Sequence, residues 1–382
     1  MSSADTQRPL RILHVLSKLE RDWRGGIGRV VTGAARAMTA RGHDVHLAGR
    51  ARDGEGVETV PGTTIHEWPG QIGHFRQLPR LLRLQRQLQP DVVHFHSTQP
   101  HGSLVLPFLK LRRFVGNPRV LATAHTGRSE PPSPLSRAVF SRLDGVVAPT
   151  AWSAERAVAA GANPEGVYVI WSGIDAVHTR DPECERPVIL AMGRMVPSKG
   201  FDILLEAFDR AAFGRPHWQL VIGGEGRELR GLRQRAEKSE HGDRIFLPGH
   251  VQGSEKERLF GEAAIAVVPS RRDMIPGVML EFQAHGIPTV ASAVGAIPEG
   301  AAGGKAARLV PPKDVHALAD TLGELMDRSE LRRQLAAGAR ETSEGRLWSR
   351  IALQLESAYR AQQTNSAKAS EVKESAQARA RA

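Results

Sequence analysis

Cysteine is almost absent from this chain of 382 residues. The single Cys184 excludes an internal disulfide and any zinc site built on several cysteines, which favours a reducing compartment. The first residues lack the apolar stretch of a signal peptide, and no run approaches the roughly 20 apolar residues that cross a bilayer. We therefore expect a cytoplasmic protein, and a peripheral position on the inner face of the membrane is left open.

Motifs for metals and dinucleotides are also missing. The chain has no H-E-x-x-H and no D-x-D, so we expect no bound metal and no resident cofactor. His94 and His96 alternate along one expected strand and are predicted to face opposite sides of it. Gly25 and Gly26 follow the first expected strand only after eight residues, and Val31 takes the place of the third glycine of the dinucleotide motif, so NAD is rejected.

Acidic residues are scarce in the first half of the chain. Of the net charge of +11, residues 1–180 contribute +9 and the remainder +2. Such a surface attracts an anionic partner, but no zinc-finger spacing or basic-aromatic pattern indicates nucleic acid. Residues 74–90, HFRQLPRLLRLQRQLQP, interleave leucine and arginine. This pattern fits a helix resting on an anionic membrane, or one packed on the core by its leucines with solvated arginines.

Apolar strand-like runs alternate with helix-period segments along the whole chain, which predicts parallel sheets covered by helices. The fold class is α/β, with two doubly wound Rossmann-like domains whose ligand loops face a shared cleft. The expected parts are an N-terminal domain at 1–178, a linker at 176–187, a C-terminal domain at 188–345, a helix at 346–362 and a disordered tail at 363–382. Whether the last helix packs back on the N-terminal domain is left open.

The expected elements are as follows. Strands are expected at 11–16, 43–49, 91–96, 118–125 and 144–150 in the first half, and at 187–194, 218–224, 244–250 and 265–270 in the second; helices are expected at 27–41, 74–90, 151–161, 201–212, 228–238, 255–263, 315–326 and 345–361.

Two carboxylates, Asp273 and Glu281, flank a Pro-Gly turn in SRRDMIPGVMLEFQAHGIPTVAS. Glu281 lies on a short, otherwise apolar helix, and a buried carboxylate without a partner is costly. Hydroxyl groups of a sugar or ribose would serve as partners, and so would water or a nearby arginine.

Two cations meet another helix start in GRMVPSKG. Arg194 follows an expected strand, and Lys199 stands just before the helix at 201–212. Cations are disfavoured at a helix N-terminus unless an anion is present, so this loop predicts a diphosphate site; two solvated side chains are the alternative. His125 ends the strand at 118–125, although a lone histidine is more often structural than catalytic.

Together these segments resemble the family 4 retaining glycosyltransferases of the GT-B fold, over nearly all of residues 10–360. The marks are GGIGRVV, DVVHFHS, the strand ending at His125, IWSGID, GRMVPSKG and DMIPGVMLEFQAHGIPTVAS followed by VGAIPE. The resemblance implies a metal-independent hexosyltransferase that moves a sugar, with retention, from a nucleotide-diphosphate sugar to a glycan or a polyprenyl-linked acceptor. Polysaccharide or glycoconjugate biosynthesis is the implied context.

The same resemblance implies the roles of particular residues. Gly25, Gly26, Gly277 and Val278 would bind the donor phosphates, Arg194 and Lys199 would neutralise the departing diphosphate, Glu281 would hold the ribose, Val251 would lie near the base, and His125 and Asp273 would face the donor sugar.

This sequence departs from the family pattern at three positions. Asp273 replaces the usual first Glu, Trp171 replaces an Asn, and Ala296 replaces a Gly. Two alternatives are kept: a non-enzymatic protein of the same fold that binds nucleotide sugars or anionic lipids, and a basic nucleic-acid-binding protein. A hydrolytic sugar-nucleotide epimerase shares the fold, but the family segments quoted above argue against it.

Overall fold

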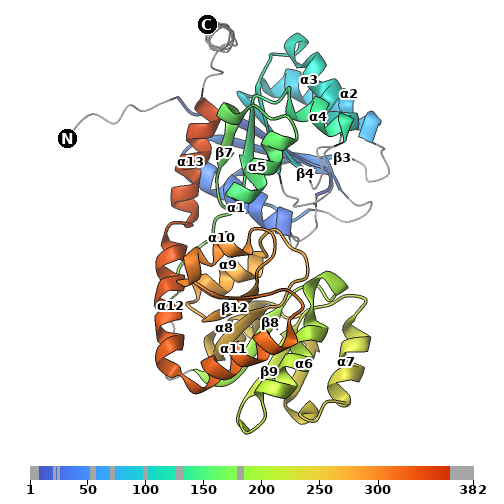
Figure 1. The fold of residues 1–382 in the computed structure, drawn as a ribbon. Coiled ribbons are helices and arrows are strands. Elements are labelled where there is room, and N and C mark those ends of the chain that lie inside the picture. Colours follow the sequence, from blue (N-terminus) through green and yellow to red (C-terminus); the bar gives the residue numbers. More distant parts are fainter. Residues whose placement is uncertain are drawn as a thin grey trace, which may run out of the picture.

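The chain forms two parallel sheets, each covered by helices, stacked one above the other (Figure 1). The structure, a computed structural model, describes residues 8–19, 23, 26–51, 57–68, 74–97, 102–124, 133–178 and 185–361. None of the helices in these ranges is both long enough and apolar enough to cross a membrane.

The N-terminal sheet has seven parallel strands in the order β3-β2-β1-β4-β5-β6-β7. The strands are β1 (Arg11–Leu16), β2 (Asp44–Arg50), β3 (Thr63–Trp68), β4 (Val92–Ser97), β5 (Arg119–Ala124), β6 (Gly145–Ala148) and β7 (Val167–Val169). The described helices of this domain are α1 (Gly26–Ala40), α2 (His74–Leu88), α3 (Gly102–Leu111), α4 (Pro134–Phe140) and α5 (Ala151–Ala159).

The C-terminal sheet has six parallel strands in the order β10-β9-β8-β11-β12-β13. The strands are β8 (Arg186–Met192), β9 (Gln219–Gly223), β10 (Ile245–Gly249), β11 (Ala263–Val268), β12 (Thr289–Ser292) and β13 (Arg308–Val310). The helices are α6 (Phe201–Ala211), α7 (Leu229–Glu237), α8 (Gly253–Glu262), α9 (Gly277–Ala284), α10 (Ile297–Gly300), α11 (Val315–Asp327), α12 (Ser329–Glu344) and α13 (Trp348–Arg360). All strand pairs are parallel, as the α/β prediction requires.

Helix α13 returns from the C-terminal domain and packs on α1 of the N-terminal domain. Ile351, Leu355 and Tyr359 join the buried cluster under the first sheet. Trp348 fits against two glycines: a Cβ at Gly33 or at Gly173 would lie 2.3 Å from its ring. The chain therefore crosses between the domains twice, and tight packing fixes the second crossing.

The strands that were not expected are short or lie near a sheet edge. These are β3, β7, β12 and β13, of which β7 and β13 have only three residues. The expected tail at 363–382 and part of the expected linker lie outside the described residues.

The leucines of α2 belong to the core of the N-terminal domain. Leu81 and Leu84 are buried, and Leu78, Leu82 and Leu88 are partly buried against the same cluster. Arg80, Arg83 and Arg86 remain exposed. Of the two interpretations of this helix, the structure shows the one in which leucines pack on the core and arginines face water.

The prediction that His94 and His96 face opposite sides of their strand is wrong. Their ring centroids lie 4.1 Å apart, because residues two apart on a strand share a face. His14 of β1 is paired in register with His94, and its Nδ1 lies 2.8 Å from Nε2 of His96. The Tyr359 hydroxyl lies 2.8 Å from Nδ1 of His94, so this buried network also holds α13.

The three histidines have hydrogen-bond partners inside the protein: His14 bonds to His96, and His94 bonds to Tyr359 and Thr123. Two imidazole nitrogens on one tetrahedral zinc lie about 3.3 Å apart, since each Zn–N bond is about 2.0–2.1 Å. The distance of 2.8 Å between His14 Nδ1 and His96 Nε2 is shorter than that, so these two nitrogens have the spacing of a hydrogen bond and not of two ligands of one zinc ion. The Thr123 hydroxyl lies 2.7 Å from Nε2 of His94.

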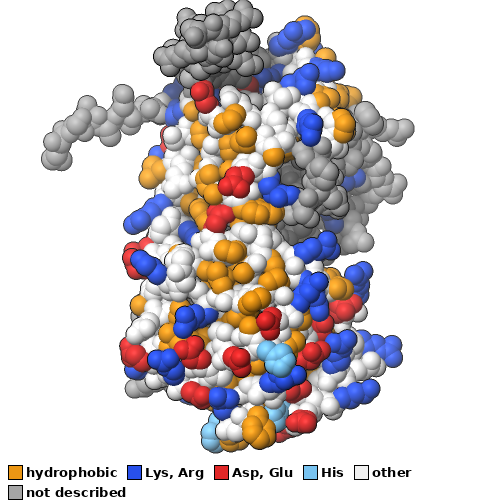
Figure 2. All heavy atoms as spheres, in the orientation of Figure 1, with side chains coloured by type: hydrophobic (Ala, Val, Ile, Leu, Met, Phe, Trp, Pro, Cys, Tyr) orange, Lys and Arg blue, Asp and Glu red, His pale blue; other side chains and the backbone are white. Residues whose placement is uncertain are grey.

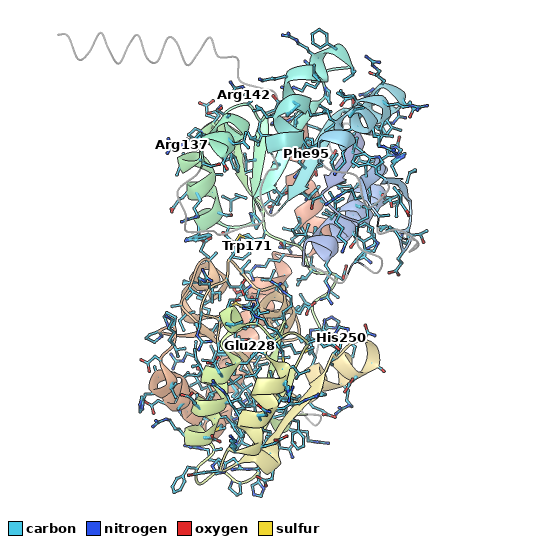
Figure 3. All side chains as sticks on the ribbon, turned by 90° about the vertical axis from the view of Figure 1, so that its right-hand side faces the viewer. Phe95, Arg137, Arg142, Trp171, Glu228 and His250 are labelled. Carbon is cyan, nitrogen blue, oxygen red and sulfur yellow. The ribbon has the colours of Figure 1, made fainter. Side chains whose placement is uncertain are left out.

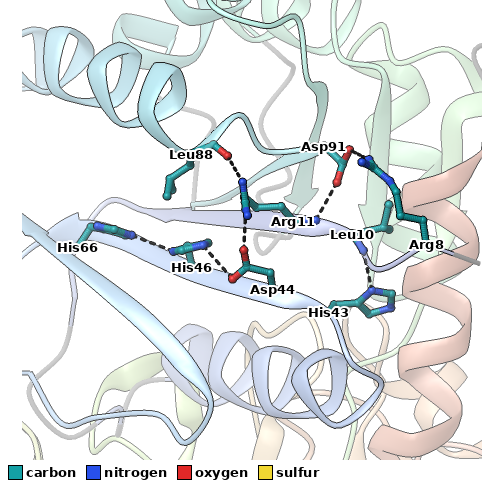
Figure 4. Close-up of polar contacts among 9 residues, drawn as sticks. All are labelled: Arg8, Leu10, Arg11, His43, Asp44, His46, His66, Leu88 and Asp91. Carbon is teal, nitrogen blue, oxygen red and sulfur yellow. Dashed lines mark hydrogen bonds and ion pairs between the residues drawn. The ribbon is translucent and has the colours of Figure 1, made fainter.

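At the N-terminal ends of the strands in this sheet, Arg11 of β1 contacts the start of β2, the end of α2 and the residue before β4 (Figure 4). Its guanidinium pairs with Asp44 of β2 and donates to the Leu88 carbonyl at 2.6 Å, and its backbone N–H donates to Asp91 at 2.8 Å. The N-terminal ends of the strands are thus fixed by charge, which leaves their C-terminal ends for ligand loops.

Burial of His14 predicts a pH-dependent stability. Burial lowers the pKa of His14 from 6.5 to about 4, so between these values the unfolded chain binds a proton that the folded chain does not. The contribution is fully present above pH 6.5 and is lost as the pH falls towards 4. The free energy of unfolding should drop by about 2 kcal/mol between pH 6.5 and pH 5 from this residue alone.

Urea denaturation at several pH values measures this dependence. His14→Gln should flatten the slope, whereas His316→Gln, at an exposed position, should keep that of the wild type. Equal slopes for the wild type and His14→Gln would contradict the attribution of this pH dependence to His14.

Candidate functional site

Lys199 is positioned by a tight turn whose next residue, Gly200, has to be glycine. After β8, the chain makes a short 3-10 helix, Pro197–Lys199, and then Gly200 with φ of 70°. A Cβ on Gly200 would lie 2.1 Å from the carbonyl oxygen of Pro269. The loop after β8 is therefore pressed against the loop after β11.

Lys199 and Asp273 form an ion pair between these two loops. Their side chains are 18% and 17% exposed. Asp273 also accepts hydrogen bonds from the Ser270 hydroxyl at 3.3 Å and from the backbone N–H of Met274 at 3.1 Å. The anion beside Lys199 is thus a carboxylate of the protein itself.

Arg271 joins the same two loops from the other side. Its guanidinium donates to both oxygens of Asp202, at 2.7 and 2.6 Å, and to the Pro197 carbonyl at 2.8 Å. Arg194, in contrast, is exposed and makes no ion pair with the residues that the structure describes. It is free to meet a ligand from solvent.

Glu281 connects the two domains. It pairs with Arg29 of α1, from the N-terminal domain, and with Lys256 of α8 at 2.9 Å. The alternative in which this carboxylate faces an arginine is therefore what the structure shows, with a lysine added. Glu281 needs no bound hydroxyl to be satisfied here.

The remaining predicted donor residues lie around the start of α9. Gly277 is the first residue of this helix and is exposed, and a Cβ there would meet no atom within 4 Å. Val278 follows it, so the two N–H groups belong to the first turn, which has no helical acceptor. Val251 is buried, with Met279 and Phe282 in the same cluster.

On the N-terminal side, the structure describes only part of the predicted site. Gly26 is exposed and begins α1, one turn before Arg29. Gly25 and His125 lie outside the described residues. Their predicted roles remain predictions.

The loop that carries Asp273 is supported from behind by Gly295 and Ala296. Gly295 has φ of 56°, and a Cβ there would lie 1.9 Å from the Asp273 carbonyl oxygen. The Ala296 N–H donates to the Met274 carbonyl at 2.8 Å. The close approach at Gly295 requires glycine, which explains that residue of VGAIPE.

Trp171 lies at the junction of the two domains (Figure 3). Its ring lies 4.1 Å from the guanidinium carbon of Arg346, which donates to Gln283 of α9 at 2.7 Å. Burial lowers the pKa of Arg346 to about 10, so it stays charged at neutral pH. Trp171 thus packs on the segment that precedes α13.

Sequence reasoning missed several residues that the structure adds to this region. Ser270 and Lys256 carry no pattern that predicts contact with Asp273 or Glu281. Arg29 and Glu299 stand within GGIGRVV and VGAIPE, but only the structure shows which groups they meet.

Comparison with known proteins finds two family models that divide the chain. The model described as Glycosyltransferase Family 4 matches residues 24–178, and the model described as Glycosyl transferases group 1 matches residues 179–342.

Curated relatives are similar over most of their length. A D-inositol 3-phosphate glycosyltransferase of Geodermatophilus obscurus is 30% identical over 398 residues, covering 91% of this chain and 87% of the relative. A glycogen synthase of Mycobacterium tuberculosis is 27% identical over 360 residues, covering 83% and 86%.

Solved structures share the fold at low identity. Sucrose-phosphate synthase from Thermosynechococcus elongatus aligns with a TM-score of 0.75 at 20% identity, over 92% of this chain and 98% of that one. HepE of Anabaena, in complex with UDP and glucose, aligns with a TM-score of 0.72 at 15% identity, over 91% and 98%. These likenesses establish the two-domain GT-B fold that the sequence predicts.

Two glycine-to-alanine substitutions distinguish the cost of backbone strain alone, at Gly303, from the added cost of displacing Asp273, at Gly295. Gly303 has φ of 66° with nothing within 4 Å of a Cβ, so Gly303→Ala should cost about 1 kcal/mol. Gly295→Ala adds a clash with the Asp273 carbonyl, so its cost should exceed that of Gly303→Ala by about 1–3 kcal/mol. Guanidinium denaturation of both variants measures the difference, and equal costs would show that the loop yields freely.

Proposed function

This chain belongs to the group 1 glycosyltransferases, with an N-terminal half of the family 4 type, and we propose that it transfers a hexosyl group with retention and without a metal. The donor is a nucleotide-diphosphate sugar, and the acceptor is a glycan or a polyprenyl-linked saccharide. The observation that carries the proposal is the cluster of Lys199, Asp273 and the start of α9 at the loops after β8 and β11.

Lys199 suits the stabilisation of a leaving diphosphate. An ammonium has three donors, and the contact with Asp273 uses one of them. The others are available to phosphate oxygens, together with the exposed Arg194 and the free N–H groups of Gly277 and Val278. Positive groups fixed where charge develops lower the barrier most effectively in a site that excludes water.

Asp273 limits how far Lys199 can move. The Ser270 hydroxyl and the Met274 N–H hold its carboxylate, so the lysine it binds is held as well. We propose that the carboxylate also meets the donor sugar and supports positive charge at the anomeric carbon. Its side chain is one methylene shorter than the usual Glu, which favours a different sugar orientation from that of relatives with Glu.

Glu281 changes partners in this proposal. In the structure it pairs with Arg29 and Lys256. A ribose hydroxyl that donates to Glu281 takes over part of this pairing, while Lys256 keeps the carboxylate in place. His125 is proposed to face the reacting carbon, and Gly25 and Gly26 the donor phosphates.

The acceptor side is proposed to meet an anionic membrane on the cytoplasmic face. Because the α2 leucines pack on the core, the contact falls instead on the 3-10 turn that follows α3, where Phe114 is 65% exposed and the Arg113 guanidinium lies 4.8 Å from its ring. Lys and Arg side chains gather with apolar ones at the top of this domain (Figure 2). A groove of about 510 Å³ nearby is lined by basic side chains, among them Lys110 and Arg142, which add further positive charge to this surface.

Donor binding is tested by thermal shift with UDP, GDP and ADP sugars. One donor at a hundred-fold excess over Kd should stabilise the enzyme by about 2.7 kcal/mol, which raises Tm by several degrees. Lys199→Ala and Glu281→Ala should abolish the rise, while Lys238→Ala, at an exposed position at the C-terminal end of α7, should not. Anomeric coupling in the NMR spectrum of the product then tests retention.

The alternative of a non-enzymatic binding protein gives a different outcome. It predicts the same thermal shift without release of nucleoside diphosphate in the presence of any acceptor. Turnover with one donor dismisses it, and the absence of any shift with all donors would contradict the proposed function.

Membrane contact is tested by sedimentation with vesicles of phosphatidylcholine, with and without phosphatidylglycerol. The protein should bind only anionic vesicles, and binding should weaken with salt. Phe114→Ser should reduce binding roughly ten- to hundred-fold, since a buried aromatic ring is worth about 1.5–3 kcal/mol. Phe213→Ser is the control, because Phe213 is 79% exposed but lies in the C-terminal domain; equal losses would contradict the assigned surface.

A further inference from the structure

Glu299 of the C-terminal domain reaches across to a helix of the N-terminal domain. One carboxylate oxygen accepts from the backbone N–H of Ala151 and the other from that of Trp152, both at 2.7 Å. These are the first two residues of α5. The contact is bidentate and joins the domains through backbone groups.

At the start of helix α5, two N–H groups have no acceptor within the helix or its cap. The Thr150 hydroxyl oxygen caps the helix by accepting from the Ser153 N–H at 3.1 Å, and the Ser153 hydroxyl oxygen accepts from the Thr150 N–H at 3.0 Å. This capping box satisfies the cap residue and the third helical position. The first and second N–H groups remain, and the helix dipole makes them a favourable place for a carboxylate.

Glu299 is also coupled to the loop that carries Asp273. It lies on α10, which begins directly after Ala296, the residue that donates to Met274. A Cβ on Gly300 would lie 2.7 Å from a side-chain carbon of Ile275, so α10 packs closely on that loop. Movement of Glu299 with α5 is therefore transmitted to the loop that holds Asp273.

We propose that Glu299 is a positioning residue that latches the two domains closed and holds the Asp273 loop in register with the N-terminal domain. The Arg29–Glu281 pair also joins the two domains, but a donor competes for Glu281, whereas the hydrogen-bond partners of Glu299 among the described residues are the two N–H groups of α5. The latch therefore persists when the donor binds. Its catalytic consequence rests on the proposed function, but its structural consequence does not.

Glu299→Gln tests the latch, because the amide keeps one acceptor and loses the other together with the charge. The N–H groups of Ala151 and Trp152 should exchange with solvent at least ten-fold faster in NMR, and small-angle scattering should give a larger radius of gyration. Glu330→Gln is the control: Glu330 lies in the same domain and pairs with Arg333 on its own helix.

Ala151→Pro removes a donor from the other side of the latch. Proline is tolerated at the first position of a helix, and Thr150 already has the extended conformation (φ −151°, ψ 160°) that precedes proline. The variant should keep α5 and open the domains as Glu299→Gln does. In the double variant, the increases in exchange rate and in radius of gyration should be smaller than the sum of the two single effects, since both changes break the same contact.

For activity, each variant should weaken binding of the nucleoside diphosphate that the thermal-shift screen selects roughly ten-fold in calorimetry and raise the donor KM similarly, with kcat changed less than three-fold. A smaller closed population lowers apparent affinity by that fraction. If the wild type binds none of UDP, GDP and ADP and turns over none of the donors, the proposed function fails while exchange and scattering still test the latch. Unchanged exchange of the Trp152 N–H and unchanged scattering in both variants would overturn the latch, whatever the activity.

Discussion

Three carboxylates of the C-terminal domain, Asp273, Glu281 and Glu299, are each held by positive charge or by free backbone N–H groups. Asp273 pairs with Lys199 in its own domain, whereas Glu281 and Glu299 reach the first turns of α1 and α5 in the other domain. A carboxylate at a partly buried junction stays there only if it is paired. The relative position of the two sheets, and with it the shape of the candidate site, depends on these pairings.

The chain path supports the same arrangement. The first crossing carries Trp171 and Gly173, and the second carries Arg346 and Trp348. Trp348 fits against glycines of both α1 and the first crossing, so the two connections pack on each other. A rotation that opened the domains about this packed pair would have to break the contacts of Glu281 and Glu299 with the N-terminal domain.

The fold was largely predictable from the sequence, because long apolar runs alternate with amphipathic segments and all expected strands of the two sheets are parallel. The strands β7, β12 and β13 were missed because three or four residues carry too little periodicity. The error at His94 and His96 came from the spacing argument itself, since residues two apart on a strand share a face.

The candidate site was predictable only in part. The positions of Lys199 and Asp273 on adjacent loops follow from parallel strands that end at one edge of a sheet. Their mutual ion pair, and the Arg29–Glu281 pair, could not be foreseen, because both depend on how loops and domains approach in three dimensions. Nor does any local pattern announce that Glu299 satisfies the start of α5; that contact joins residues about 150 positions apart in the chain.

The central claim is that the cluster around Lys199 is a diphosphate site. A crystal structure with the bound nucleoside diphosphate measures this most directly. The account predicts a phosphate oxygen within hydrogen-bond distance of Lys199 Nζ and of the Gly277 N–H, with Asp273 still at the lysine. A diphosphate bound elsewhere, with both of these groups out of reach of it, would contradict the account.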